Sequence, residues 1–497
     1  MTFALLFSVA VIATCGLVYE LIAGALASYL LGDSITQFSF IIGAYLFSMG
    51  IGSYLSKFVT KKLLATFISI EFLVGIFGGL SATVLFLSFE YISSFRILLY
   101  LFVFIIGTLV GLEIPLLMRI LEDKYEFKDL VSKVFTVDYI GALFASITFP
   151  LFLAPQLGLM RTALLFGMFN ILVGLWTLYL FRNELHNFRL QRLAGIAAFA
   201  IMVLGFVYSN KLLHFAESNH YADPIIYNKK SPYQKLIITK GNDLKLFING
   251  NLQFSSMDEY RYHEALIHPA MGSRTDIKKV LVLGGGDGFA IREILKYPQV
   301  ESITLVDLDP LMTKIFKSNQ QLVELNNGAL NSSKVKIIND DAFVWMKNKN
   351  KQKFDFIVID FPDPSNFSLG KLYSKSFFKI VKNTLSDEGL MVIQSTSPYF
   401  ARKSFWCVGN TIDHVGLRTT PYHAYVPSFG EWGYFIASKT AYKIPTSFVE
   451  GLKFLNVKTL QQMFEFPIDM SKVETKVNRL NNQILVRYFE QEWSSFN

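Results

Sequence analysis

Five aspartates of this chain follow short apolar runs of the kind that form buried strands. They are Asp287, Asp307, Asp341, Asp360 and Asp363. In a parallel α/β sheet, ligands bind along the edge where the carboxyl ends of the strands meet. Carboxylates gathered there attract cations, accept the hydrogen bonds of a ribose diol and take a proton from a reacting group. The residue types therefore predict a site for a positively charged ligand and for proton transfer.

Asp287 lies in a glycine-rich turn, residues 284–288, which joins the apolar run 280–283 to a helical pattern. Glycines let the backbone approach a ligand, and the helix that follows presents its N-terminus there. The glycine spacing is not the one that seats a pyrophosphate, and Asp287 would repel a phosphate. A cationic adenosyl sulfonium therefore fits better than a dinucleotide. Asp307, about twenty residues on, is placed to bind its ribose, and Asp341 to meet its adenine.

Apolar runs that alternate with helical patterns predict an α/β Rossmann-like sheet of the methyltransferase type. The expected strands are 279–284, 302–307, 335–338, 354–360 and 389–394. A small β unit at 222–256 precedes them, with strands at 236–239 and 244–248 and a hairpin turn of the primed type at Asn249-Gly250. A helical stretch follows near 258–271.

The first part of the chain is predicted to be an all-α polytopic membrane bundle. The chain is 52% hydrophobic and 17% charged, against roughly 25% charged in soluble proteins. Because ~20 residues cross a bilayer, we expect about seven spans, at 3–31, 36–56, 63–88, 95–118, 135–156, 159–181 and 193–208. The predicted domains are 1–208 for the bundle, 209–270 for the small β-rich part and 271–497 for the Rossmann-like part.

Four acids lie within the apolar runs: Glu20, Glu71, Glu113 and Asp138. Carboxylates inside a membrane are costly and often functional. No matching row of basic residues suggests a transport path, so we interpret these acids as paired within the bundle or lying near an interface.

The remaining composition excludes several classes of protein. The net charge of +8 fits basic loops beside an anionic lipid surface. The second half has no dense Lys/Arg stripe interleaved with aromatic residues, so we expect no nucleic-acid partner. Two cysteines, Cys15 and Cys407, make a disulfide framework untenable and have no metal-site spacing.

Residues 222–440 resemble the polyamine aminopropyltransferases, of which spermidine synthase is the type. The resemblance rests on several blocks in the right order: Tyr233-Gln234, Leu252-Gln253, the run 258–264, the glycine block with Arg292-Glu293, Asp307, Asp340-Asp341-Ala342, Asp360 to Asp363-Pro364, and Gln394. The first half, with Tyr19-Glu20-Leu21 and Gly32-Asp33-Ser34, resembles the multi-pass membrane extension of some bacterial members.

This resemblance implies transfer of a propylamine group from decarboxylated S-adenosylmethionine to putrescine, which gives spermidine and 5′-methylthioadenosine. The donor activates its own carbon, so neither a metal nor a cofactor is expected. The roles implied are proton acceptor for Asp363 and substrate contact for the others: Gln234, His263, Asp287, Asp307, Asp341, Ala342 and Asp360. The resemblance also implies a homo-oligomer, and the first half implies contact with membrane lipid.

Two segments depart from the family pattern. Residues 365–373 replace a Gly-Pro-Ala-like stretch, and Phe429 stands where many members have tyrosine. Both departures fall near the acceptor amine, so the identity of the diamine stays open.

Two other functions compete with this interpretation. An S-adenosylmethionine-dependent methyltransferase shares the sheet, but Asp287 disfavours the donor carboxylate that it would need. A membrane polyamine transporter or sensor with a non-catalytic domain is the other alternative, and the intact set of acids argues against it.

We expect a multi-pass protein of the cell (inner) membrane with its catalytic half in the cytoplasm. Basic residues gather in three loops, at 57–62, 119–133 and 182–192. The positive-inside rule places these loops in the cytoplasm, and seven spans would then put the second half outside. The metabolic activity implied above favours the cytoplasm, so the helix count is left open.

Overall fold

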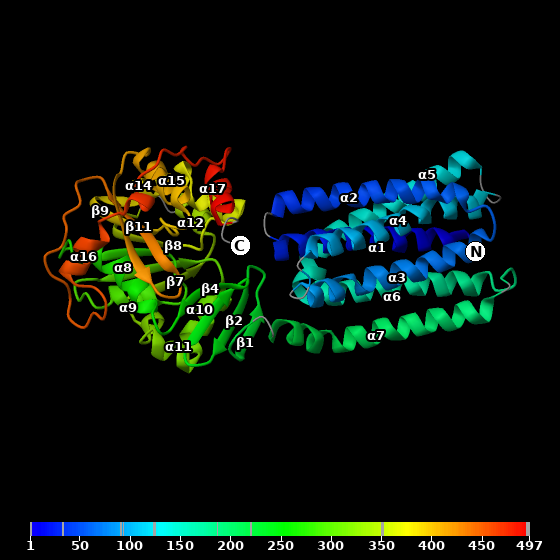
Figure 1. Ribbon diagram of the computed structural model, residues 1–497, viewed down its shortest axis with the longest axis horizontal. Helices are drawn as coiled ribbons and strands as arrows, with labels where there is room; N and C mark the ends of the chain where they lie inside the picture. The colour runs from blue at the N-terminus through cyan, green and yellow to red at the C-terminus, as the bar shows by residue number, and fades with distance from the viewer. Residues whose placement is uncertain are drawn as a thin grey trace. The chain divides into compact units, whose positions relative to one another are not determined.

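A computed structural model describes residues 2–31, 34–89, 92, 94–122, 126–185, 187–218, 221–348 and 352–493. The chain divides into two compact units, Met1–Ala222 and Asp223–Asn497. Each is described by itself below, and both are drawn in Figure 1. Gly32 and Asp33, part of the motif quoted for the first half, lie outside the described residues.

The first unit is a bundle of long apolar helices (Figure 1). Its elements are α1 (Thr2–Leu31), α2 (Ser34–Leu55), α3 (Leu63–Ser88), α4 (Phe95–Leu121), α5 (Phe127–Thr148), η3 (Phe149–Leu157), α6 (Gly158–Leu180) and α7 (Phe188–Ser218). In the described part of the chain, six apolar helical segments are long enough to cross a membrane. One of them, Phe127–Leu180, contains α5, η3 and α6. The expected all-α bundle of long apolar helices is confirmed, while the predicted boundary at residue 208 falls inside α7.

The second unit begins with a small antiparallel sheet. Its strands are β1 (Ile225–Lys230), β2 (Lys235–Lys240), β3 (Leu244–Ile248) and β4 (Asn251–Ser255), paired in that order. Asn249 and Gly250 both have positive φ, 51° and 86°, as the primed hairpin turn between β3 and β4 requires. The helix α8 (Glu259–Met271) follows and leads into the larger sheet.

The described strands of the larger sheet run in the order β10-β11-β9-β8-β5-β6-β7. Five of them pair with one another in parallel and confirm the expected strands: β5 (Lys279–Gly284), β6 (Ser302–Asp307), β7 (Val335–Asn339), β8 (Phe354–Asp360) and β9 (Leu385–Gln394). The sheet is not wholly parallel, because β10 (Arg418–Val426) and β11 (Gly430–Ser438) add an antiparallel hairpin at one edge.

Helices cover both faces of this sheet. They are α9 (Phe289–Ile294), α10 (Pro310–Ser318), α11 (Gln320–Leu325), α12 (Ala342–Asn348), α13 (Phe367–Gly370), α14 (Lys375–Thr384), α15 (Arg402–Asp413), α16 (Val457–Met463) and α17 (Ile484–Trp493). Successive strand residues point to opposite faces, so Val280 and Val282 of β5 pack in one core with Phe289 of α9. Leu281 and Leu283 pack in a second core.

The strand register brings the predicted acids to one edge. Gly284 of β5 is paired with Asp360 of β8, and Asp307 of β6 is paired with Asn339 of β7. The carboxyl ends of β5, β6, β7 and β8 therefore lie at the same edge of the sheet, and the loops that follow these strands lie along that edge.

Candidate active site

The glycine turn after β5 holds the acid that ends β6. The backbone N–H of Gly286 donates to Asp307 Oδ2 at 3.1 Å. A Cβ on Gly286 would lie 2.6 Å from the same oxygen, so only glycine fits here without displacement. Asp307 Oδ1 accepts from the N–H of Asp309 at 2.9 Å. Burial raises the pKa of Asp307 to about 6, and the nearby charges of Asp287 and Asp309 act in the same direction.

Asp287 sits at the end of the same turn, where α9 begins. Its Oδ1 accepts from the backbone N–H of Phe289 at 3.0 Å. Burial raises the pKa of Asp287 to about 6; His263 opposes this shift, while Asp360 and Glu259 add to it. A cationic ligand would stabilise the ionised form of Asp287 against the effects of burial and of the neighbouring carboxylates.

Asp360, at the end of β8, is held by a tyrosine from α8. The Tyr262 hydroxyl donates to Asp360 Oδ1 at 2.6 Å. Burial raises the pKa of Asp360, whereas the charge of His263 and the hydrogen bond from Tyr262 lower it. Asp287, Asp360 and His263 therefore lie within electrostatic reach of one another.

His263 is fixed by an ion-pair network on its own helix and on α9. Its Nδ1 lies 2.8 Å from Glu259 Oε2. Glu259 is clamped by Arg292, whose two terminal nitrogens donate to its two carboxylate oxygens at 2.9 Å each. Burial lowers the pKa of His263, but the Glu259 carboxylate outweighs burial and the net pKa is raised. Glu259, which is itself held by Arg292, thus fixes the orientation of the buried His263 imidazole.

Asp363 follows β8 by three residues and has neutral hydrogen-bond donors. The Thr396 hydroxyl donates to Asp363 Oδ2 at 3.0 Å, and Gln394 Nε2 donates to Oδ1 at 3.5 Å. Burial raises the pKa of Asp363 to about 7, although these two hydrogen bonds lower it. A carboxyl whose pKa lies near neutrality is suited to accept a proton during a reaction.

Asp341 and Ala342 stand at the start of α12, beyond the end of β7. Asp341 Oδ1 caps the helix by accepting from the N–H groups of Phe343 and Val344, at 2.8 and 3.2 Å. Its Oδ2 forms an ion pair with Lys371 Nζ at 2.6 Å. Burial raises the pKa of Asp341, but the hydrogen bond from Lys371 and the capping N–H groups hold it below its usual range. Ala342 is buried beside this carboxylate.

Gln234 lies in the turn between β1 and β2, and a hydrogen bond ties this turn to the same edge of the larger sheet. The backbone oxygen of Gln234 accepts from the N–H of Ser231 at 2.8 Å. The Ser231 hydroxyl in turn donates to Asp309 Oδ2, also at 2.8 Å. The turn that carries Gln234 therefore lies beside the loop that follows β6.

Several residues of this site were not singled out from the sequence. Tyr262 lies in the run 258–264 without a feature that distinguishes it from its neighbours, and Thr396 follows β9 without any motif that marks it. Trp432 donates its indole N–H to Gln394 Oε1 at 3.2 Å, and Phe429 packs against Trp432 with ring centroids 5.2 Å apart. The hydrogen bond between Trp432 and Gln394 joins residues 38 positions apart, which no local pattern reveals. Phe429 is a near neighbour of Trp432 in the chain and already stands out in the sequence as a departure from the family pattern.

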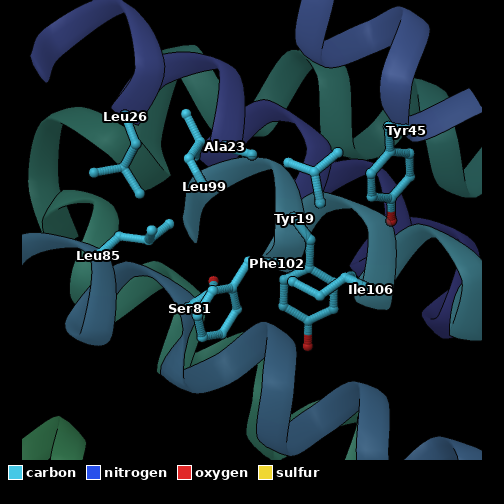
Figure 2. Close-up of a pocket in the computed structure, with 10 residues that line it drawn as sticks. Tyr19, Ala23, Leu26, Tyr45, Ser81, Leu85, Leu99, Phe102 and Ile106 are labelled. Carbon is cyan, nitrogen blue, oxygen red and sulfur yellow. The ribbon is translucent and has the colours of Figure 1, made fainter. Parts of the chain in front are cut away.

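No group of three or more His, Cys, Asp or Glu side chains within the described ranges could hold a metal ion. In the helical unit, Glu71 Oε2 accepts from Asn170 Nδ2 at 3.0 Å, and Asn170 Oδ1 accepts from the Tyr19 hydroxyl at 3.0 Å. Glu71 is thus paired within the bundle. Tyr19 also borders a largely apolar pocket, shown in Figure 2, that neither Glu71 nor Glu113 lines.

The fold and the strand ends define a Rossmann-like α/β protein with buried carboxylates gathered at one edge of its sheet. Comparison with known proteins is more specific. Residues 259–447 match the family model described as "Spermine/spermidine synthase domain". Over 99% of both chains, the protein is 51% identical to a polyamine aminopropyltransferase of Leptospira interrogans. It is 54% identical to polyamine aminopropyltransferase 2 of Ralstonia nicotianae, over 98% of both chains.

The chain therefore belongs to the polyamine aminopropyltransferase family, and it is a transferase that moves aminopropyl groups in polyamine biosynthesis. A solved spermidine synthase in complex with the transition-state analogue AdoDATO is also similar. It is 26% identical, with a TM-score of 0.46, and the match covers 49% of this chain and 85% of that one.

Proposed function

We propose that this enzyme transfers the propylamine group of decarboxylated S-adenosylmethionine to putrescine, and that it releases spermidine and 5′-methylthioadenosine. The observation that carries the proposal is the gathering of Asp287, Asp307, Asp360 and Asp363 at one edge of the sheet, three of them with a pKa raised to about 6 or 7. Four buried carboxylates close to one another favour the binding of a dicationic acceptor beside a cationic donor.

In this proposal each residue has one task. Asp307 accepts from the ribose hydroxyls, and Asp341 with the buried Ala342 contacts adenine. Asp287 pairs with the ammonium of the propylamine group. Asp360, with Gln234 and His263 nearby, binds the diamine. Catalysis and most substrate binding are assigned to the predicted domain 271–497, and the predicted domain 209–270 contributes Gln234 and His263.

The transfer itself is a single displacement. The lone pair of an unprotonated amine nitrogen attacks the propyl carbon next to the sulfonium. The new C–N bond forms as the C–S bond breaks, and the bonding electrons return to sulfur, which leaves as a neutral thioether. The proton lost by the attacking nitrogen passes to the Asp363 carboxylate. Because the donor carries its own leaving group, positioning of the two substrates supplies much of the rate.

Product analysis with paired donors tests this proposal. Purified full-length protein is given either decarboxylated S-adenosylmethionine or S-adenosylmethionine, with putrescine and, in separate reactions, diamines one carbon shorter or longer. We expect methylthioadenosine and spermidine with the decarboxylated donor, and no S-adenosylhomocysteine with the other. Formation of S-adenosylhomocysteine would favour the methyltransferase alternative. A strong preference for another diamine would correct the acceptor, and Phe429 beside Trp432 is the first place to look for the cause.

We also propose that the protein is a multi-pass protein of the cell (inner) membrane, in contact with lipid and assembled as a homo-oligomer, with its catalytic unit in the cytoplasm. The apolar helical segments support membrane insertion. Cys15 and Cys407 are both free, which fits a reducing compartment. A fluorescent-protein fusion at the C-terminus is expected to fluoresce in cells, whereas an active periplasmic phosphatase fusion at that position would reverse the orientation.

A further inference from the structure

Thr396 has a backbone conformation that threonine rarely adopts. Its φ is +54°, in the left-handed region where a β-branched side chain is a genuine outlier. The residue comes two positions after the end of β9 and is buried. Such strain persists only where the surroundings impose it, and it tends to gather at functional sites.

Backbone contacts on both sides impose this conformation. The N–H of Thr396 donates to Gln394 Oε1 at 3.1 Å, and the carbonyl of Thr396 accepts from the N–H of Gly433 at 2.7 Å. A Cβ on Gly433 would clash with the Phe405 ring and would lie 3.0 Å from that carbonyl oxygen, so the close packing at this point of β11 depends on glycine. The strand pair thus holds the Thr396 backbone while its side chain remains directed at Asp363.

The hydroxyl of Thr396 makes the shorter of the two hydrogen bonds to Asp363. It donates to Oδ2 at 3.0 Å, whereas Gln394 Nε2 lies 3.5 Å from Oδ1. Thr396 also orients that glutamine, because Gln394 Oε1 accepts from the Thr396 N–H and from Trp432 Nε1. With its oxygen so engaged, the amide presents its nitrogen to the Phe361 carbonyl and the Tyr373 hydroxyl, and Asp363 Oδ1 is a more distant partner at 3.5 Å.

We propose that Thr396 is a positioning residue for the transfer, which orients the Asp363 carboxylate and keeps it ionised in the resting enzyme. This inference rests on the proposed role of Asp363 as proton acceptor. A hydroxyl that donates to a carboxylate stabilises the ionised form and lowers its pKa, which offsets part of the effect of burial on Asp363.

Among the described titratable groups, Tyr373 on η5 (Lys371–Tyr373) interacts electrostatically with Asp363, and Asp360 acts on the same tyrosine. Substitution of Thr396 leaves both groups in place. A change in the titration of activity between Thr396 variants therefore reports on the hydroxyl.

The test compares three variants of the full-length enzyme in detergent with the same donor and diamine. Thr396→Val keeps the shape and removes the hydroxyl, Thr396→Ala removes it with less crowding, and Thr396→Ser retains it. We expect the acidic limb of the kcat profile to move up by about one pH unit in the Val and Ala variants, because a hydrogen bond to a charged group has that effect. Ser should restore the wild-type profile, and the donor KM should not change in any variant. Titration of the amine itself is common to all variants and cancels.

Asp363→Asn, measured in the same assay, distinguishes a failure of the inference about Thr396 from a failure of the role proposed for Asp363. If Asp363→Asn is inactive and the acidic limbs of Thr396→Val and Thr396→Ala match the wild type, the inference about Thr396 is wrong and the role of Asp363 stands. If Asp363→Asn turns over at the wild-type rate, the proposed function of Asp363 fails, and the inference fails with it.

Discussion

Asp287 and Asp363 differ in what surrounds each carboxylate, and the difference suits them to different tasks. The field at Asp287 includes the charges of His263, Asp360 and Glu259. Asp363 is instead held by two neutral donors, Thr396 and Gln394. A carboxylate among charges is suited to bind a cation, whereas one with neutral donors and a pKa of about 7 is suited to exchange a proton.

The first prediction concerns donor binding by Asp287. Asp287→Asn keeps the shape of the side chain and removes its charge. Because a hydrogen bond to a charged group contributes about 1.5–3 kcal/mol, we expect the KM for the decarboxylated donor to rise roughly 10- to 150-fold, with a smaller change in kcat. Steady-state kinetics with varied donor measure this.

Asp387→Asn is the matched control for that prediction. Asp387 has a fully exposed side chain and pairs with Lys439 at 3.1 Å, so the same change of charge is made near the start of β9, away from the carboxyl ends of the strands. A donor KM unchanged by Asp287→Asn, or raised equally by Asp387→Asn, would contradict the role assigned to Asp287.

The gathering of acids at the strand ends could be predicted from the sequence, because a parallel sheet brings its carboxyl ends together. Asp307 and Asp360 end β6 and β8, and Asp287 lies in the turn after β5. Thr396 could not be found, because its φ of +54° is imposed by contacts with β11. The partner of Asp360 was also missed, since Tyr262 reaches it across 98 positions in the chain.

At the scale of elements, the buried parallel strands could be predicted from the sequence, whereas the edge strand β10 and the end of α7 could not. The strands β5 to β9 are buried and read as apolar runs, so their positions follow from composition. The strand β10 contains Pro421, which argues against a central strand. It is tolerated because β10 forms the edge of the sheet. The end of α7 was missed because the helix continues past its apolar part, Phe188–Ser209, to Ser218.

The second prediction follows from the acids held at the strand ends. Asp287, Asp307 and Asp363 have pKa values of about 6, 6 and 7 in the folded state. At pH 8 their charges destabilise the unliganded fold, and this destabilisation is relieved as pH falls through those values. His263 and His423 have raised pKa values as well, so their stabilisation also grows as pH falls.

We therefore expect the catalytic unit to melt several degrees higher at pH 6 than at pH 8, since one pKa unit corresponds to about 1.4 kcal/mol and 1 kcal/mol to roughly 2–4 °C. Tryptophan fluorescence of the full chain measures this, because Trp345, Trp406, Trp432 and Trp493 lie in the second unit and only Trp176 in the first. Asp363→Asn should flatten the dependence. A melting temperature that rises with pH over this window would contradict the account.

At the scale of the whole molecule, the predicted site draws on the second unit alone. Every residue proposed to contact a substrate lies between Gln234 and Asp363, and Thr396 also falls within Asp223–Asn497. That unit has hydrophobic cores on both faces of its sheet. The transfer reaction should therefore not require the helical unit. Within that unit, the buried carboxylate of Glu71 accepts a hydrogen bond from Asn170.

The third prediction is that residues 223–497, expressed alone, fold and form methylthioadenosine from the decarboxylated donor and putrescine. Circular dichroism checks the fold, and product analysis checks the activity, with Asp363→Asn in the same fragment as the inactive control. A folded but inactive fragment would mean that the helical unit contributes to catalysis.

The most direct test of the account is the release of methylthioadenosine by full-length Asp363→Asn under single-turnover conditions, with donor binding measured on the same preparation. The account predicts that the donor binds as it does to the wild type. The rate of release should fall by about 10²–10⁴-fold, the usual contribution of a general base. Release at a rate close to that of the wild type would contradict the assignment of Asp363 as the proton acceptor.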